Sequence, residues 1–135
     1  MAYRTLAFGL ALALATAAPA VAQDAGSWSV EGRIGAVSDY RDRGYALSAE
    51  DPVVQGEVTA SHASGLYGGV WGSGIEEYGI GADGDGARIE VTLYAGWAGA
   101  ISGFDVDLGV WQNVYPDGDD VSYVEFPLQV GRTFG

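Results

Sequence analysis

The sequence contains no cysteine and no lysine, and its six basic residues are all arginines. Without cysteine, disulfide bridges and thiol chemistry are excluded. The 18 acidic residues leave a net charge of −12 at pH 7. Such a chain repels phosphate groups, so nucleic acid and anionic lipid surfaces are poor partners. We therefore predict no nucleic-acid partner.

The sequence is also short of the side chains that enzymes use in combination. His62 is the only histidine, and no catalytic triad or zinc site can be assembled around it. Glu90, Asp105 and Asp107 could form a paired-carboxylate hydrolase site, but their regular spacing on one face fits a channel wall better. We predict that the protein is not an enzyme and needs no cofactor.

Two acidic turns, at residues 83–86 and 117–120, raise the alternative of a calcium site, because calcium binds carboxylate oxygens. Neither turn matches a full EF-hand loop, which ends in a glutamate at its twelfth position. We predict solvated turns and no metal.

The only long apolar run lies at the start of the chain. A short basic start is followed by an apolar stretch over residues 6–15, and Ala20-Val21-Ala22 matches a cleavage site. This pattern predicts a secretory signal peptide over residues 1–22 and one domain over residues 23–135. A membrane anchor is the alternative, although the run is short for a span of about 20 residues.

The remaining chain alternates between apolar and polar residues. From Ile89 to Trp97 every odd position is apolar, and Phe104 begins a second run of the same kind. A period of two is typical of β-strands, whose successive side chains point to opposite faces. Residues 98–103 between the runs contain two glycines and a serine, which predicts a hairpin loop.

Six segments show this alternation, and no segment after residue 22 has a helical period. We predict an all-β fold, an antiparallel up-and-down meander of about six strands. The predicted strands are residues 28–39, 53–62, 66–75, 89–97, 104–115 and 123–134.

Each predicted strand has an apolar and a polar face, and most charged residues of the strands fall on the polar face. If the apolar faces meet lipid, the polar faces line a wet lumen, as in an outer-membrane β-barrel. The alternative is a soluble periplasmic β-sandwich, a binding or structural module, whose apolar faces pack about 10 Å apart. The candidate pore-lining residues are Glu31, Arg33, Glu57, Glu90, Asp105, Asp107 and Glu125.

Aromatic residues concentrate near the ends of the predicted strands. Outer-membrane barrels carry aromatic girdles at both membrane interfaces, whereas a soluble sandwich would use the same residues for core packing. The candidate girdle residues are Trp28, Tyr40, Tyr67, Tyr78, Trp97, Trp111, Tyr115 and Tyr123.

Residues 38–44, SDYRDRG, form the one dense cluster of both charge signs. Asp39, Arg41 and Arg43 are candidates for a pore mouth or constriction, where the two arginines would select anions. The alternative is a salt-bridged strand end and turn, with Gly44 supplying a positive φ.

Several blocks of sequence, in this order, give a more specific indication. They are VSDYRDRGYALSAEDP at residues 37–52, GLYGGVW at 65–71, YAGW at 94–97 and DLGV at 107–110. This series resembles the TorF-type family of porins of Gram-negative bacteria, across residues 28–130. The resemblance implies an outer-membrane β-barrel, with membrane lipid and small hydrophilic solutes as partners.

Family members of this type are about twice as long, so the chain resembles their amino-terminal half. Six strands are too few for a lone bacterial barrel, which has at least 8. We therefore expect one of three cases: a truncated open reading frame, a fragment, or a subunit that closes only as a homo-oligomer. The excess of Glu and Asp on the polar face predicts that a pore would prefer cations.

Overall fold

The structure is a computed structural model that describes residues 20–25, 27–78, 86–118 and 121–132. All its regular elements are strands, which confirms the predicted all-β class. They are β1 (Ala20–Ala25), β2 (Trp28–Val37), β3 (Arg41–Asp42), β4 (Tyr45–Ala46), β5 (Val53–His62), β6 (Leu66–Tyr78), β7 (Ala87–Ile101), β8 (Phe104–Val114), β9 (Tyr123–Glu125) and β10 (Leu128–Gly131).

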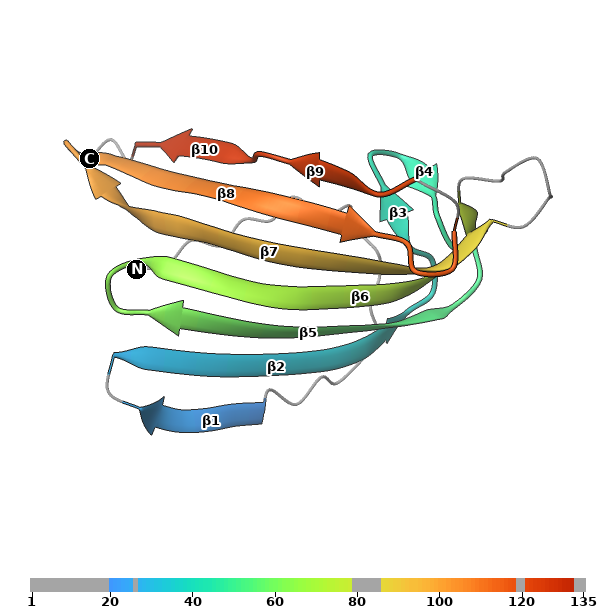
Figure 1. Cartoon of the computed structure of the whole chain (residues 1–135), viewed down its shortest axis with the longest axis horizontal. Coiled ribbons are helices and arrows are strands. Elements are labelled where there is room, and N and C mark those ends of the chain that lie inside the picture. Colours follow the sequence, from blue (N-terminus) through green and yellow to red (C-terminus); the bar gives the residue numbers. More distant parts are fainter. Residues whose placement is uncertain (1–19, 26, 79–85, 119–120, 133–135) are drawn as a thin grey trace.

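The strands form one antiparallel sheet in the order β1-β2-β5-β6-β7-β8-β10, and β9 also pairs with β8. Successive long strands are neighbours, as Figure 1 shows for β5 to β8, so the predicted meander is confirmed. The order starts at β1 and ends at β10, and the sheet is not closed on itself. β3 and β4 make a separate two-stranded ribbon.

The prediction of about six strands missed β1, at the amino-terminal edge of the sheet. β1 begins at Ala20 and pairs with β2, with Ala20 opposite Gly32 and Ala22 opposite Val30. It therefore spans the proposed cleavage point before Gln23, and cleavage there would leave only part of β1. The rest of the predicted signal peptide, residues 1–19, lies outside the described residues.

The predicted six-residue hairpin loop at 98–103 was wrong. β7 continues to Ile101, which pairs directly with Phe104 at the start of β8. Only Ser102 and Gly103 turn the chain, with φ of 52° and 80°. Two successive positive φ angles suit a type I′ turn, whose twist matches that of a hairpin. Residues 98–101 continue the strand and pair with residues 107–104 of β8.

The last predicted strand is divided in two. β9 and β10 both pair with β8, and Phe126 and Pro127 separate them. Proline has no N–H to donate to a ladder, so it is confined to edges and interruptions of sheets. The Pro127 carbonyl still accepts a hydrogen bond from the Gly109 N–H, at 3.0 Å.

We call the outer face the side of the sheet that carries the apolar positions of the alternation. Its large side chains are exposed: Leu93 of β7 is 50% exposed and Leu128 of β10 is 66% exposed. Other exposed members are Val30, Ile34, Val54, Val58, Leu66, Val70, Ile89, Leu108, Val110, Val124 and Val130. The outer face is thus an apolar surface that the described residues leave exposed.

We call the inner face the opposite side, which carries the polar positions. Its buried residues include Thr59, Ser73, Glu90, Thr92 and Asn113. An apolar cluster also lies at one end, built on Tyr40, Ile75, Ala87 and Tyr115. Apart from this cluster, the sheet buries polar side chains on its inner face and exposes aliphatic ones on its outer face.

The connections differ in length at the two ends of the sheet. At one end the chain turns through residues 63–65 and 102–103, and at the other it passes through residues 38–52, 79–86 and 115–122. Figure 1 shows the β3–β4 ribbon at the end with the long connections. Within the described part of the chain, no helix has the length and apolar character needed to traverse a bilayer.

Candidate functional site

The connection between β2 and β5, residues 38–52, carries the β3–β4 ribbon and is held at its base by hydrogen bonds. The Tyr40 N–H donates to Ser48 Oγ at 2.8 Å, and the Leu47 N–H donates to the Tyr40 carbonyl at 2.7 Å. The Glu76 N–H of β6 donates to the Leu47 carbonyl at 2.6 Å. We call this connection, residues 38–52, the ribbon loop. These hydrogen bonds fix its base to the sheet.

Packing also holds the base of the ribbon loop. The Tyr40 ring lies 5.5 Å from the Trp71 ring on the inner face of β6. Tyr40 belongs to the same buried cluster as Ile75 and Tyr115. Because Tyr40 comes from the loop and its neighbours come from the sheet, this cluster packs the loop onto the inner face.

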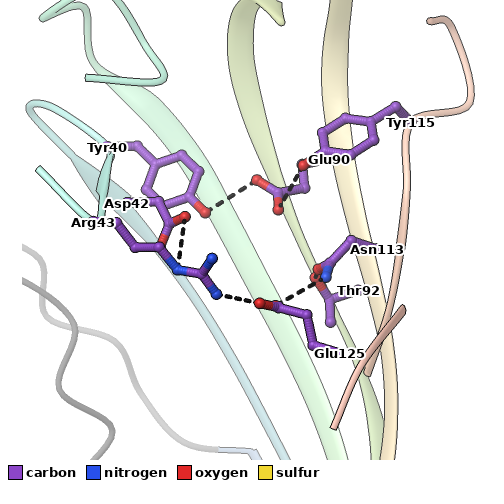
Figure 2. A network of polar contacts seen from close by, with 8 residues as sticks. All are labelled: Tyr40, Asp42, Arg43, Glu90, Thr92, Asn113, Tyr115 and Glu125. Atoms are coloured by element: carbon purple, nitrogen blue, oxygen red, sulfur yellow. Dashed lines mark hydrogen bonds and ion pairs between the residues drawn. The ribbon is translucent and has the colours of Figure 1, made fainter. Parts of the chain in front are cut away.

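Glu90 of β7 is the buried carboxylate of this region, with 4% of its surface exposed. The Tyr40 hydroxyl donates to Glu90 Oε2 at 3.0 Å, and the Tyr115 hydroxyl donates to Oε1 at 3.3 Å, as Figure 2 shows. Burial raises the pKa of both phenols above the usual range, and the adjacent carboxylate raises it further. Both hydroxyls therefore keep their protons at neutral pH and act as donors.

A second set of contacts lies beside the first. The Arg43 guanidinium forms an ion pair with Glu125 of β9 and lies 3.9 Å from Asp42. Asn113 donates to Glu125 Oε2 at 3.3 Å and accepts from Thr92 Oγ1 at 2.7 Å. Figure 2 shows Arg43 reaching from the ribbon loop towards Glu125.

The structure separates the three predicted pore-mouth residues. Arg41 pairs with Asp39 and with Glu50 at 3.2 Å, so its contacts stay within the ribbon loop. Arg43 reaches the sheet instead. Arg43 and Gly44 have φ of 48° and 90° and form the turn of the ribbon. Both the salt-bridged turn and an inward-reaching arginine are therefore present.

The register of the sheet puts all seven predicted pore-lining residues on the inner face. Glu31 and Glu125 lie in the row that runs through Thr59 and Tyr94. Arg33 and Glu57 form an ion pair across β2 and β5. The remaining candidates are Glu90 near the long connections, and Asp105 and Asp107 near the Ser102–Gly103 turn.

Six of the eight predicted girdle residues lie on the inner side. Tyr40 and Tyr115 are buried, and Tyr115 stacks with Tyr78 at 4.8 Å and Tyr123 at 6.3 Å. An outward girdle would require these rings on the outer face, because it contacts lipid. The other inner-face members are Tyr67 and Trp111; the outer-face members are Trp28 and Trp97.

Two inner-face tyrosines lie across glycines of neighbouring strands. A Cβ at Gly96 of β7 would meet the Tyr67 ring, and a Cβ at Gly69 of β6 would meet the Tyr94 ring. The Tyr67 hydroxyl donates to Asp107 at 2.6 Å, and the Tyr94 hydroxyl bonds to Glu57 and Thr59. The missing side chains leave room for rings that lie along the wall and link three strands.

The geometry can be set beside comparisons with known proteins. A family model described as a bacterial protein of unknown function, Gcw_chp, matches residues 21–135. The chain belongs to this family. The match includes the ribbon loop and every long strand of the sheet. No curated protein and no solved structure matches the chain.

The sequence of this Gcw_chp protein gave no signal for the contact of Tyr40 with Glu90. The two residues are 50 positions apart, and loop residues have no period from which a facing partner can be inferred. The sequence suggests Tyr40 as a girdle residue, and Glu90 as a pore-lining residue or one of a pair of hydrolase carboxylates, but not the two as partners. A tyrosine beside an arginine-rich turn, with a glutamate on the polar face, is too common a combination to indicate this pair.

The Gcw_chp structure also bears on the acidic turns. Asp117 accepts backbone hydrogen bonds from Arg88 at 3.0 Å and from Ile89 at 3.3 Å, so it closes the end of the sheet. Residues 83–85, 119 and 120 lie outside the described residues. Among the residues that are described, no group of three histidines or carboxylates could hold a metal ion.

The buried Glu90 predicts a measurable effect on stability. Glu90→Ala leaves the Tyr40 and Tyr115 hydroxyls without their acceptor. A buried donor without a partner costs about 1–3 kcal/mol, so we expect the free energy of unfolding to fall by about 2 kcal/mol. Urea unfolding followed by tryptophan fluorescence measures this change. Glu90→Gln keeps one acceptor oxygen and is the matched control; equal losses in both variants would contradict the role of these hydrogen bonds.

Proposed function

We propose that this Gcw_chp protein is an outer-membrane β-barrel wall of the TorF porin type. Its activity is the passive diffusion of small hydrophilic solutes along the inner face, and it prefers cations. The proposal requires no catalytic step and no cofactor. The partners are membrane lipid on the outer face and hydrated solutes on the inner face.

The exposure of the outer face carries this proposal. Side chains such as Val58 of β5, Leu93 of β7 and Leu108 of β8 are about half exposed. Soluble monomers rarely expose continuous apolar patches larger than a few hundred Å², and burying one Leu or Val contributes about 1.5–3 kcal/mol. Lipid chains remove such a face from water, while the acidic inner face stays wet.

The lengths of strands and connections give further support. β2 and β5 have 10 residues, β6 has 13, β7 has 15 and β8 has 11. A tilted membrane strand needs about 9–11 residues. Outer-membrane barrels have short periplasmic turns and longer extracellular loops, and the two ends of this sheet differ in the same way. The ribbon loop would then lie at the extracellular end.

The proposal requires further strands, because the sheet is open at both edges. Single-chain bacterial barrels contain at least 8 strands, so the edges at β1 and β10 must pair with further strands. A second copy of this chain or additional sequence of the same protein would supply them. The soluble alternative, a sandwich, needs a second layer over the outer face, and no such layer exists among the described residues.

Cell fractionation followed by gel electrophoresis with and without boiling tests the proposal. A closed barrel resists detergent when cold and migrates differently after boiling. We expect the protein in the outer-membrane fraction, with a boiling-dependent shift. Recovery as a soluble periplasmic monomer without a shift would reject the barrel and favour the sandwich.

Ion selectivity gives a separate prediction. Asp105 and Asp107 lie on the inner face near the Ser102–Gly103 turn, outside the contacts of the ribbon loop. In planar bilayers under a salt gradient, the reversal potential should show cation preference, and the double variant Asp105→Asn/Asp107→Asn should weaken it. Asp51→Asn, in the ribbon loop, is the control for the loss of one acidic charge. Anion preference of the unmodified protein would contradict the role of the acidic face.

A further inference from the structure

The ribbon loop lies against the inner face of the sheet. Its contacts reach residues far along the chain: Tyr40 contacts Glu90, and Arg43 contacts Glu125, 82 positions away. Figure 2 shows these loop residues facing the sheet residues. A connection placed in this way occupies the space that the inner face encloses.

The base and the tip of the ribbon loop have different surroundings. At the base, Tyr40 and Ser48 are buried and Leu47 packs against the aromatic cluster. At the tip, Arg43, Gly44 and Tyr45 are exposed, and Tyr45 is 76% exposed. The base therefore sets the position of the loop, because exposed ion pairs such as Arg43–Glu125 contribute little to stability. The two charges of that pair remain accessible to solvent and to solutes.

The two arginines of the loop are not equivalent. Arg41 is paired with Asp39 and Glu50, which belong to the same loop. The guanidinium of Arg43 projects beyond the loop to the Glu125 carboxylate on β9. Of these two arginines, Arg43 is the one whose positive charge lies opposite a carboxylate of the sheet.

We propose that the ribbon loop is the constriction of the conduit and that Arg43 and Glu125 determine its charge selectivity. This inference rests on the function proposed above and adds the residues that act on a passing ion. A cation is attracted by Glu125 and repelled by Arg43, and an anion experiences the reverse. Removing either charge should shift selectivity in opposite directions.

The position of the loop can be tested without any measurement of transport. The chain has no cysteine, so Arg43→Cys/Glu125→Cys introduces the only two thiols. A short bis-maleimide should link them in the purified, detergent-solubilised protein, as detected by mass spectrometry of tryptic peptides. The matched control is Arg43→Cys/Val124→Cys, because Val124 is adjacent in sequence but lies on the outer face. Absence of a link at 43–125, or equal linking in both variants, would overturn the placement of the loop.

Selectivity is then measured from reversal potentials in planar bilayers under a salt gradient. Arg43→Gln should raise the cation-to-anion permeability ratio, and Glu125→Gln should lower it. Each shift should be about four-fold, because one unit charge at about 10 Å in water changes the energies of the cation and of the anion by about 0.4 kcal/mol each, in opposite directions. Arg41→Gln removes the same charge from the same loop and should leave the ratio nearly unchanged.

The outcomes separate the two proposals. Conduction with opposite shifts at residues 43 and 125 and none at 41 supports the constriction. Conduction with no shift at either residue, or with equal shifts for Arg43→Gln and Arg41→Gln, overturns the constriction and leaves the porin function standing. No conduction by the unmodified protein rejects the porin function, and with it the constriction, even if the cross-link forms.

Discussion

Leu93→Arg is expected to abolish assembly in the outer membrane. Leu93 lies in the central part of β7 on the outer face and pairs with Val70 of β6. It is half exposed, and nothing in the described structure covers it. An arginine facing lipid at the midplane of a bilayer costs about 2–4 kcal/mol, which is a large part of the 5–15 kcal/mol that stabilises a typical protein.

A variant that adds the same charge to the other face of β7 shows whether the effect comes from the outer face or from the charge alone. Ala98 belongs to β7, lies on the inner face opposite Asp107 and is exposed. Ala98→Arg should therefore assemble normally, because its guanidinium enters water beside a carboxylate. Both variants are compared by outer-membrane fractionation and by the gel shift on boiling. A soluble, folded Leu93→Arg protein would show that the outer face meets water, and the barrel proposal would fail.

Gly96→Ala is expected to cause the second large effect, through the packing of Tyr67. The new Cβ would lie 2.5 Å from Tyr67 Cζ and 2.6 Å from the Leu108 carbonyl oxygen. Real Cβ atoms do not tolerate such separations, so the ring and part of the backbone must move. Overpacking typically costs about 1–3 kcal/mol, and loss of the bond from Tyr67 to Asp107 would add to it.

The control for this prediction is Gly32→Ala in β2. There the nearest atoms, the Glu57 carbonyl oxygen and a Val58 methyl, lie 3.8 and 3.9 Å from the new Cβ. Gly32→Ala should leave stability unchanged or raise it slightly, because alanine loses less backbone entropy on folding. In a Tyr67→Ala background, Gly96→Ala should cost less than it does in the unmodified protein, because the ring is gone. Part of the cost should persist, because the Leu108 carbonyl remains. Equal unfolding midpoints in urea for Gly96→Ala and Gly32→Ala would contradict the packing of the ring on Gly96.

The long strands were predictable because the alternation of side chains is a direct consequence of strand geometry. β5 was predicted with its observed bounds, and Trp28, Leu66 and Phe104 were predicted as first residues of their strands. The division into an apolar and a polar face was predictable for the same reason.

The ends of elements were less predictable, because the signals compete there. The glycines at 99 and 103 suggested a loop, but only Gly103 has a positive φ and serves the turn. Pro127 interrupts the last strand within a run whose alternation continues through it. Residues 20–22 of β1 fall in the predicted signal peptide, and residues 23–25 were not predicted as a strand, since this alanine-rich segment carries no alternation that would favour one.

The candidate site was predictable only in part. The pattern put Glu90 and Glu125 on the polar face, and the charge density drew attention to Arg41 and Arg43. Nothing in the sequence indicated which arginine would reach the wall or that Tyr40 would be buried. These features depend on how the ribbon loop packs on a sheet formed by distant residues, and one sequence contains no direct information on such contacts.

The unpaired edge at β10 exposes the protein to aggregation until further strands complete the sheet. Residues Leu128–Gly131 carry no charge and are exposed throughout. Such an edge is a template on which other chains can add strands, and the flanking Pro127 and Arg132 discourage that addition. At high concentration the chain can therefore stack into cross-β aggregates before the edge finds its proper neighbour. Under the proposed barrel function, expression yield should then depend on how quickly the sheet is completed in the membrane, more than on the stability of the finished fold.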